Sequence, residues 1–368
     1  MSFGFDSLEA LRLAQCCRLG TSDGGNLSAS SVRYSSITTL WGGMGEIYHV
    51  VVATTATTTD THGNSGNTEF VVKYMDPEVG PHPSRGDQRK LDSYVVEAAF
   101  YRDYNQELLQ RGVGLAKCLY VEGGEKDASS SSSSSGQHKT ILCLSVLQNV
   151  PSHIDYYETT LEWLANFHAA TWHRPAETVQ SIGTYWHLDT RPDEHARMRS
   201  NKSWEGRLKL AARPIHEWLQ HSTSIQSWVH GDAKDANVMW DGNKVCLCDF
   251  QYVGKGCPAK DLVYFLVSNG VADNSEEEGG YVDLYFEKLC DKLDDPPLRR
   301  AFDDAMELAY CDYQRFMSGW GEWGSNIRAR VTKTLNKIDG GTKLGSEQDY
   351  RAALAEVFPK LGHVCKDS

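Results

Sequence analysis

The segment from His230 to Gln251 constrains the fold of this chain more than any other part of its sequence. It reads HGDAKDANVMWDGNKVCLCDFQ, in which two short apolar stretches, 238–240 and 245–248, flank an Asp-Gly-Asn sequence that favours a tight turn. Strands paired across this turn would bring the polar residues before the first strand close to those after the second. The segment therefore predicts a short β-hairpin with clustered polar side chains at its open end.

The spacing of Asp232, Asn237 and Asp249 in this cluster suits phosphoryl transfer. A carboxylate must accept or orient the proton of an attacking hydroxyl group, and oxygen ligands must hold Mg²⁺ against the phosphates. We therefore expect Asp232 to be the catalytic base, and Asn237 and Asp249 to be metal ligands. Lys234 is a second catalytic candidate, because it resembles the lysine that many protein kinases have at this place, which neutralises charge on the transferred phosphate. The alternative for Lys234 is a plain solvent-facing lysine.

Length, charge and cysteine spacing narrow the class of protein. A chain of 368 residues is long enough for two packed lobes, and its net charge of -12 argues against nucleic acid as the main partner. The ten cysteines lack the paired spacing of a zinc site, which favours free thiols in a reducing compartment. The N-terminus has no long apolar run. We expect a cytoplasmic protein without a membrane partner; whether it has a protein partner is unknown from the sequence.

Hydrophobic periodicity separates a strand-rich first part from a helix-rich second part. Residues 1–31 predict a short helix over 8–20 and a linker, and residues 151–368 are mainly helical, with acidic or glycine-rich loops such as 274–280. Between them, residues 32–150 predict strands within 34–55, 69–75, 116–122 and 140–147, a helix over 91–111, a connecting loop over 54–66 and a disordered serine-rich loop over 126–138. An α+β chain of this kind places its ligand cleft between two lobes.

The segment from His230 to Gln251, called the catalytic segment below, resembles the kinase-like superfamily that includes aminoglycoside phosphotransferases, choline kinases and the insect ecdysteroid kinase-like proteins. HGDxxxxN followed by DFQ, with PAKDLVYF at 258–265, is most similar to the ecdysteroid kinase-like (CHK kinase-like) branch. The resemblance covers most of the chain. It implies a two-lobed protein-kinase-like fold, with a small antiparallel-sheet N-lobe and a larger, mainly helical C-lobe. It also implies that ATP and Mg²⁺ are cofactors, and that His230 and Asp261 support the catalytic segment structurally.

The same resemblance implies a lysine and a glutamate that together hold the nucleotide phosphates. Lys73 lies in the apolar strand EFVVKYM, where an unpaired ammonium group would be costly, and Glu97 follows on the predicted helix. Their order before the catalytic segment is that of the superfamily. We therefore expect Lys73 and Glu97 to be nucleotide-binding residues.

Two further stretches are nucleotide-binding candidates. Gly43 and Gly45 follow the first strand, where glycine would let backbone amides approach the phosphates, although an ordinary turn is the alternative. Ser145 and Leu147 lie at the expected hinge between the lobes, where backbone groups would meet adenine. The family often has an acidic pair here, and this chain has Ser145-Val146 in its place.

A small hydroxylated molecule is the expected acceptor of the phosphoryl group. Only eleven residues separate Asp249 from Asp261, which leaves no room for the activation loop that protein kinases use to bind peptides. The segment between Trp172 and Trp204, and aromatic residues such as Trp320 and Trp323, are candidates to contact the acceptor; core packing is the alternative for the aromatics. The alternative functions are a catalytically silent nucleotide-binding or scaffold protein, and an atypical protein kinase.

Overall fold

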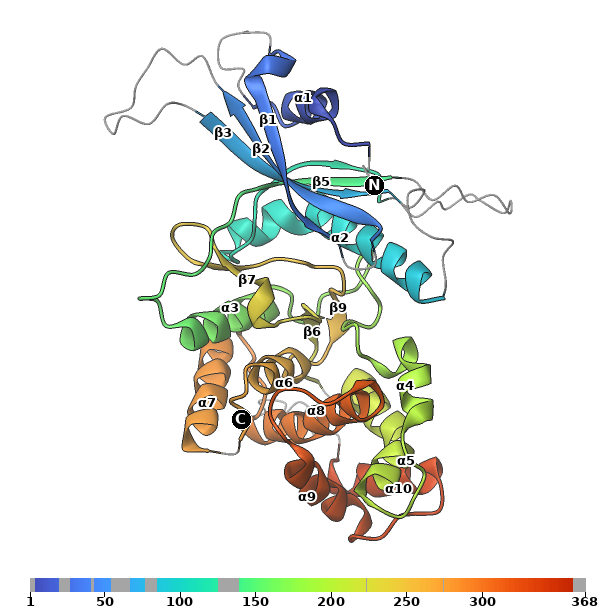
Figure 1. Cartoon of the computed structure of the whole chain (residues 1–368). Coiled ribbons are helices and arrows are strands. Elements are labelled where there is room, and N and C mark those ends of the chain that lie inside the picture. The colour runs from blue at the N-terminus through green and yellow to red at the C-terminus, as the bar shows by residue number, and fades with distance from the viewer. Residues whose placement is uncertain are drawn as a thin grey trace. The chain divides into compact units, whose positions relative to one another are not determined.

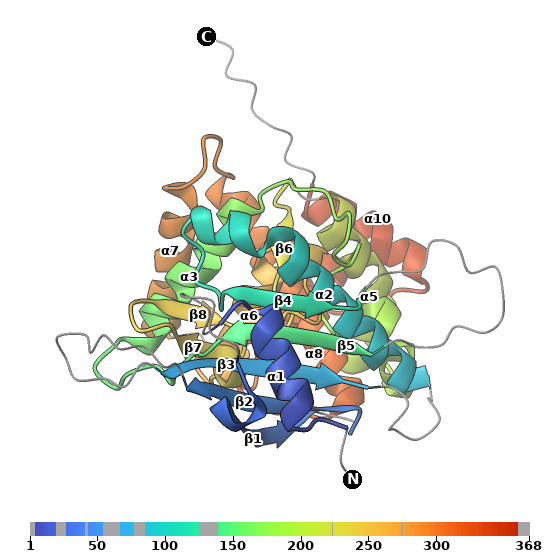
Figure 2. The same cartoon turned by 90° about the horizontal axis from the view of Figure 1, so that it is seen from above.

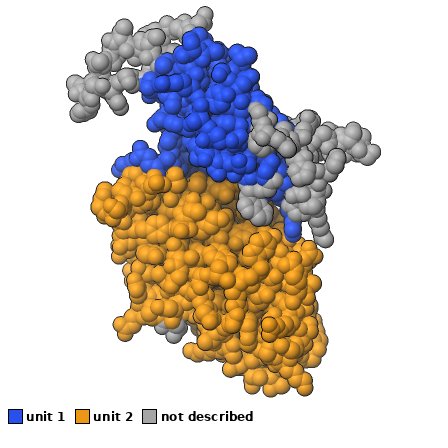
Figure 3. Space-filling view, viewed as in Figure 1, with its two compact units in different colours: residues 1–148, 241–243 blue, residues 149–240, 244–368 orange. Residues whose placement is uncertain are grey.

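The computed structural model describes residues 4–19, 27–40, 43–53, 67–76, 85–124, 139–222, 224–273 and 275–359. The chain divides into two compact units (Figure 3). The first contains residues 1–148 and 241–243, and the second contains residues 149–240 and 244–368. The loops predicted at 54–66 and 126–138 lie outside the described residues.

A five-stranded antiparallel sheet forms the first unit, with its strands in the order β1-β2-β3-β5-β4 (Figure 1). The strands are β1 (Val32–Thr39), β2 (Gly45–Ala53), β3 (Asn67–Met75), β4 (Cys118–Glu122) and β5 (Thr140–Ser145). In the central strand β3, Lys73 pairs with Ile47 of β2 and Leu142 of β5. Valine, isoleucine and aromatic side chains dominate β2, β3 and β5 and suit a pleated, buried surface.

Two helices cover opposite faces of this sheet (Figures 1 and 2). Side chains alternate between the two faces along a strand, so Val50, Phe70 and Val72 all point to the face that packs on α1 (Ser7–Cys16). Lys73, one position on from Val72, points to the face covered by α2 (Arg85–Gln110). This alternation places one charged residue of β3 beside α2 and leaves its apolar neighbours on α1.

The second unit is mainly helical. Its helices are α3 (Tyr156–Ala170), α4 (Pro192–Arg197), α5 (Trp204–Glu217), α6 (Ala259–Ser268), α7 (Glu276–Cys290), α8 (Arg299–Trp320), α9 (Arg328–Asp339) and α10 (Glu347–Val357). Four strands of three residues pair as β6 (Ser227–Val229) with β9 (Gly254–Gly256), and β7 (Val238–Trp240) with β8 (Val245–Leu247). The helix α6 is buried along nearly all of its length and packs on α8. This short helix is therefore the centre of the second unit.

The α+β fold class predicted from the sequence is confirmed, with an antiparallel sheet in the N-terminal part and helices in the C-terminal part. The loop expected at 274–280 is wrong, because α7 begins at Glu276 and includes both glycines. The Ser275 hydroxyl accepts a hydrogen bond from the Glu278 amide. Three glutamates in the first turn stabilise the helix, because their negative charges interact favourably with the positive end of its dipole. No helix among the described residues is long and apolar enough to cross a membrane.

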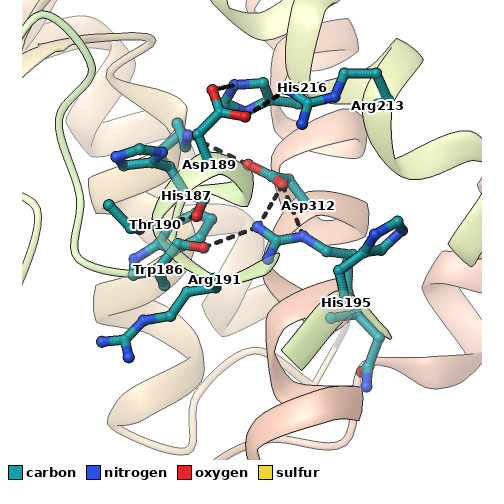
Figure 4. Close-up of polar contacts among 12 residues, drawn as sticks. Trp186, His187, Asp189, Thr190, Arg191, His195, Arg213, His216 and Asp312 are labelled. Atoms are coloured by element: carbon teal, nitrogen blue, oxygen red, sulfur yellow. Dashed lines mark hydrogen bonds and ion pairs between the residues drawn. The ribbon is translucent and has the colours of Figure 1, made fainter. Parts of the chain in front are cut away.

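A cluster of buried charges joins α6 to α8. Lys260 of α6 and Arg315 of α8 both contact the carboxylate of Asp312, at 3.2 and 2.8 Å, and all three side chains are fully buried. Arg315 also donates to the carbonyl oxygen of Trp186 (Figure 4). Burial alone would raise the pKa of Asp312, but the charges of Lys260 and Arg315 lower it. The cluster therefore fixes the start of α6 against α8 and the segment around residue 186.

Two buried histidines beside this cluster, His187 and His216, should make the stability of the protein depend on pH. Burial and the charge of Lys260 lower the pKa of His187 to about 3 and that of His216 to about 4, from an ordinary 6.5. The unfolded chain therefore binds more protons than the folded chain below about pH 6.5. We expect the free energy of unfolding to fall as the pH is lowered from 6.5 to 5, by roughly 1.4 kcal/mol per pH unit for each histidine.

Urea unfolding followed by tryptophan fluorescence at several pH values tests this expectation. In the double variant with His187→Gln and His216→Gln, the free energy of unfolding should change less steeply with pH than in the wild type. His153→Gln, which changes an exposed histidine, is the matched control. Equal slopes for the double variant and the wild type would contradict the prediction.

Candidate active site

The predicted hairpin is present, and it brings the two ends of the catalytic segment together. In the β7–β8 pair, Val238 lies opposite Leu247. The amide of Cys248 donates to the carbonyl oxygen of Asn237 at 3.0 Å, so the pairing continues to the residues at the open end. Residues 235–237 form one turn of 3₁₀ helix before β7. The polar residues on both sides of the hairpin are therefore neighbours, as the Asp-Gly-Asn turn predicts.

Asp261, in the first turn of α6, holds the catalytic loop in place. Its two carboxylate oxygens accept hydrogen bonds from the backbone amides of His230 at 2.5 Å and Gly231 at 2.9 Å. Its Oδ2 also lies 3.2 Å from Nε2 of the buried His168. Gly231 has a φ of +84°, and a side chain there would collide with the backbone of Thr184 and Tyr252. The loop thus has a sharp, fully packed turn immediately before Asp232.

His230 connects the loop to the opposite strand. Its Nε2 lies 3.0 Å from the carbonyl oxygen of Cys248, and its Nδ1 accepts the Asp232 amide at 3.2 Å. These contacts define a neutral imidazole with the proton on Nε2. Burial lowers the pKa of His230, which keeps the ring neutral. The geometry is that of a structural brace between Asp232 and the residue that follows β8.

The Asp232 carboxylate is buried and accepts hydrogen bonds on both oxygens. Tyr264 donates to Oδ1 at 2.8 Å, whereas Lys234 and Asn237 donate to Oδ2 at 2.9 and 3.2 Å. Burial raises the pKa of Asp232, the Lys234 charge opposes this rise, and the nearby charge of Asp249 adds to it. A buried carboxylate held in this way is oriented, ionisable and able to accept a proton from a hydroxyl group.

Asn237 and Asp249 offer the oxygen donors that Mg²⁺ prefers. The Asn237 side-chain nitrogen donates to both the backbone and side-chain oxygens of Asp232, so its Oδ1 is the atom suited to a cation. Asp249 has a φ of +68°, a conformation that non-glycine residues rarely adopt. No group of three or more His, Cys, Asp or Glu residues suited to a metal occurs in the described parts of the chain. Two protein ligands suit Mg²⁺, because phosphate oxygens and water usually complete its coordination shell.

Lys73 and Glu97 form an ion pair within the first unit. Lys73 Nζ lies 2.6 Å from Glu97 Oε2, and the two side chains are 9% and 2% exposed. The ammonium group also lies 5.9 Å from the centre of the Tyr94 ring. The pairing satisfies a lysine that an apolar strand could not otherwise bury. The structure thus brings together the two residues that the sequence predicts as a pair.

The other candidate nucleotide-binding residues have structural contacts of their own. Gly43 lies in the turn after β1 with a φ of +69°, whereas a side chain at Gly45 would collide with the carbonyl oxygen of Tyr74 in β3. Glycine at position 45 is therefore required by the sheet itself. At the predicted hinge, the Ser145 amide donates to the carbonyl oxygen of Lys117, so it is already engaged. Leu147 is half-buried and follows the end of β5.

Two tyrosines near Asp232 were not predicted from the sequence as site residues. Tyr264 follows Asp261 by three positions, one turn of α6, so the Asp261-Leu-Val-Tyr264 spacing is a signal that could have identified it. Tyr185 comes from the segment between Trp172 and Trp204, and its hydroxyl lies 3.3 Å from that of Tyr264. Nothing in the sequence around Tyr185 indicates this proximity, because it depends on the packing of a loop.

A conservative substitution at Tyr264 tests how Asp232 is held. Tyr264→Phe removes a hydrogen bond that stabilises the ionised carboxylate, so we expect the pKa of Asp232 to rise further. Titration of the carboxyl carbon by ¹³C NMR in labelled protein measures this directly. Tyr185→Phe is the matched control, because its hydroxyl reaches Asp232 only through Tyr264 and its effect should be smaller. An unchanged or lowered pKa in Tyr264→Phe would contradict this account.

Comparison with known proteins gives one family. Residues 150–302 match the model of APH, described as the phosphotransferase enzyme family. This range contains all of the catalytic segment together with Asp261 and Tyr264. A search of curated proteins gives no match.

Solved structures are similar over most of their length. Amicoumacin kinase has 13% sequence identity and a TM-score of 0.50, with coverage of 91% of this chain and 94% of the other. An aminopropanol kinase associated with a microcompartment has 13% identity and a TM-score of 0.49, with coverage of 97% and 100%. Choline kinase from Streptococcus pneumoniae has 12% identity and a TM-score of 0.41, with coverage of 82% and 92%. The chain therefore has the protein-kinase-like α+β fold, and its residues 150–302 match a phosphotransferase family.

Proposed function

We propose that this protein transfers the γ-phosphoryl group of ATP to a hydroxyl group of a small molecule. The observation that carries the proposal is the buried Asp232 carboxylate, which three donors orient and which lies beside the oxygen ligands Asn237 and Asp249. The match of residues 150–302 to a phosphotransferase family supports the reaction type. The names of the similar structures, which include kinases for amicoumacin, aminopropanol and choline, support a small acceptor.

In the proposed reaction, Asp232 accepts the proton of the acceptor hydroxyl as its oxygen bonds to the γ-phosphorus. The bond between that phosphorus and the bridging oxygen of ADP breaks in the same step, and ADP leaves. The raised pKa of Asp232 makes this carboxylate a better proton acceptor than an exposed aspartate. Tyr264 fixes one carboxylate oxygen, and Lys234 places a positive charge near the group being transferred.

Asn237 and Asp249 would hold Mg²⁺, which when bound offsets negative charge on the phosphate oxygens. The donor set fits, because both residues present oxygen atoms and Asn237 directs its nitrogen to Asp232. His230 and Asp261 keep the loop and the second strand in register. These four residues therefore serve geometry and charge, and the proton moves only to Asp232.

Lys73 would bind the α- and β-phosphates of ATP, with Glu97 fixing its ammonium group. Gly43 and Gly45 are proposed to lie by the phosphates, and Ser145 and Leu147 by adenine. The engaged amide of Ser145 leaves its carbonyl oxygen or the backbone of Leu147 for this contact. In this division of tasks, residues 32–150 bind the nucleotide and residues 151–368 carry the acceptor site.

The finer assignment to the ecdysteroid kinase-like branch belongs to this proposal and rests on the HGD, DFQ and PAKDLVYF sequences alone. A cytoplasmic location likewise stays a prediction. Neither affects the reaction, which depends on the residues around Asp232.

Substitution of the two aspartates separates chemistry from nucleotide binding. We expect Asp232→Asn to lower the rate of phosphate transfer by several orders of magnitude and to leave Mg²⁺·ATP binding nearly unchanged. Asp249→Ala should abolish transfer and weaken nucleotide binding when Mg²⁺ is present. Calorimetric titration with ATP, with and without Mg²⁺, measures binding, and transfer from radiolabelled ATP to a pool of small alcohols measures activity.

Asp235→Asn is the matched control, because it makes the same charge change on an exposed side chain three residues away. It should retain both binding and transfer. Full activity in Asp232→Asn would refute the assignment of the base. Binding of Mg²⁺·ATP without transfer to any alcohol would favour the silent nucleotide-binding protein instead.

A further inference from the structure

An unbroken series of aromatic rings extends outward from Asp232. Ring centres are separated by 6.0 Å between Trp323 and Tyr264, 5.9 Å between Tyr264 and Tyr185, 5.5 Å between Tyr185 and Phe316, and 5.6 Å between Phe316 and Trp320. We call these five residues the aromatic wall. They come from the 173–203 segment, α6, α8 and the loop after α8, so four parts of the second unit converge here.

The two ends of the aromatic wall are exposed, and its middle touches the proposed base. Trp320 and Trp323 are 46% and 38% exposed, whereas Tyr264 is buried and donates to Asp232. An acceptor whose hydroxyl group reaches Asp232 would have its remaining atoms beside these rings. Large exposed aromatic side chains next to a catalytic group commonly mark a binding surface.

The positively charged guanidinium group of Arg191 lies over three rings of the aromatic wall. Its guanidinium carbon lies 5.4 Å from the centre of the Tyr185 ring, 5.8 Å from Phe316 and 5.0 Å from Trp320. All three distances are in the range of cation–π interactions. Ring faces that would attract a quaternary ammonium group therefore already interact with a cation.

The position of Arg191 is fixed by several contacts. Its Nε donates to the carbonyl oxygen of Tyr185 at 2.8 Å, and the buried Glu194 lies 3.7 Å from its Nη1. Figure 4 shows its side chain directed away from Asp312, so it does not join the buried cluster between α6 and α8. The side chain is 15% exposed. A bound molecule would therefore meet a guanidinium group that is ion-paired with Glu194 and held in place before binding.

We infer that the aromatic wall binds an acceptor alcohol with an apolar body and no positive charge, and that Arg191 is the residue that excludes cationic acceptors. The inference rests on the proposed function for the identity of the reacting hydroxyl group. A cationic acceptor would be repelled by Arg191 and would have to displace it from three rings. An uncharged alcohol can pack against Trp320 and Trp323 without disturbing that arrangement.

A pair of alcohols with the same shape tests the charge preference. Choline and 3,3-dimethylbutan-1-ol differ only by a quaternary nitrogen in place of a quaternary carbon. Binding of each to the full chain is measured by saturation-transfer NMR in the presence of Mg²⁺·ATP, and transfer of phosphate to each is measured in parallel. We expect the neutral alcohol to be preferred by about tenfold or more, because repulsion between like charges near a protein surface is of this order.

Three variants identify the source of the preference. Arg191→Met should reduce the ratio of neutral to cationic binding by about tenfold, and Arg191→Lys should largely retain it because the charge remains. Arg197→Met is the matched control: it removes a positive charge from α4, the helix that begins directly after Arg191, at a residue that donates to the carbonyl oxygen of Gly319. It should leave the ratio unchanged. The wild-type comparison requires no substitution, so a folding defect in Arg191→Met leaves the inference testable.

Equal or tighter binding of choline by the wild type would overturn the inference, as would an unchanged ratio in folded Arg191→Met. Binding of neither alcohol would overturn the assignment of the aromatic wall to the acceptor. Absence of Mg²⁺·ATP binding by the wild type is a separate outcome, which contradicts the proposed function. The relative binding of the two alcohols still decides whether Arg191 excludes cations.

Discussion

The carboxylate of Asp261 is the constraint on which the candidate active site depends. Two adjacent backbone amides, those of His230 and Gly231, donate to it from a loop whose turn requires a positive φ. A buried carboxylate that accepts backbone hydrogen bonds is satisfied only when the loop has one conformation. That conformation directs Asp232 toward Tyr264 and places Asn237 at the start of β7. The positions of the proposed base and the proposed metal ligands therefore depend on one residue of α6.

The sequence predicts most of this cluster because the relevant contacts are local. His230, Asp232, Asn237 and Asp249 lie within twenty residues of one another, and a turn that is readable as Asp-Gly-Asn joins their strands. The Lys73–Glu97 pair was predictable for a different reason, because the resemblance to the kinase-like superfamily implies it and an unpaired lysine in an apolar strand would be costly. The sheet and the long helices follow from strong periodicity, and the fold class follows from their order.

Other features depend on tertiary packing and escape a sequence pattern. Tyr185 reaches Tyr264 only because an irregular segment folds back on α6, and no periodicity records that path. Asp312 and Arg315 are charged residues, which usually lie at the surface, yet both are buried and pair with each other. From the sequence, two charged residues at these positions do not indicate that this face of α8 is buried. At α7, the N-cap and the first-turn glutamates outweigh two glycines, a local competition that composition alone does not resolve.

Adjacent residues at the start of α6 connect the catalytic loop to the helical core. Asp261 binds the loop, while Lys260 is buried against Asp312 of α8. The strands of the hairpin have only three residues each, too few to hold such a loop by themselves. The loop instead shares the stability of the α6–α8 packing. In terms of hydrogen exchange, the amides of His230 and Gly231 belong to the cooperative unit of the core, so opening of this loop requires the core to open with it.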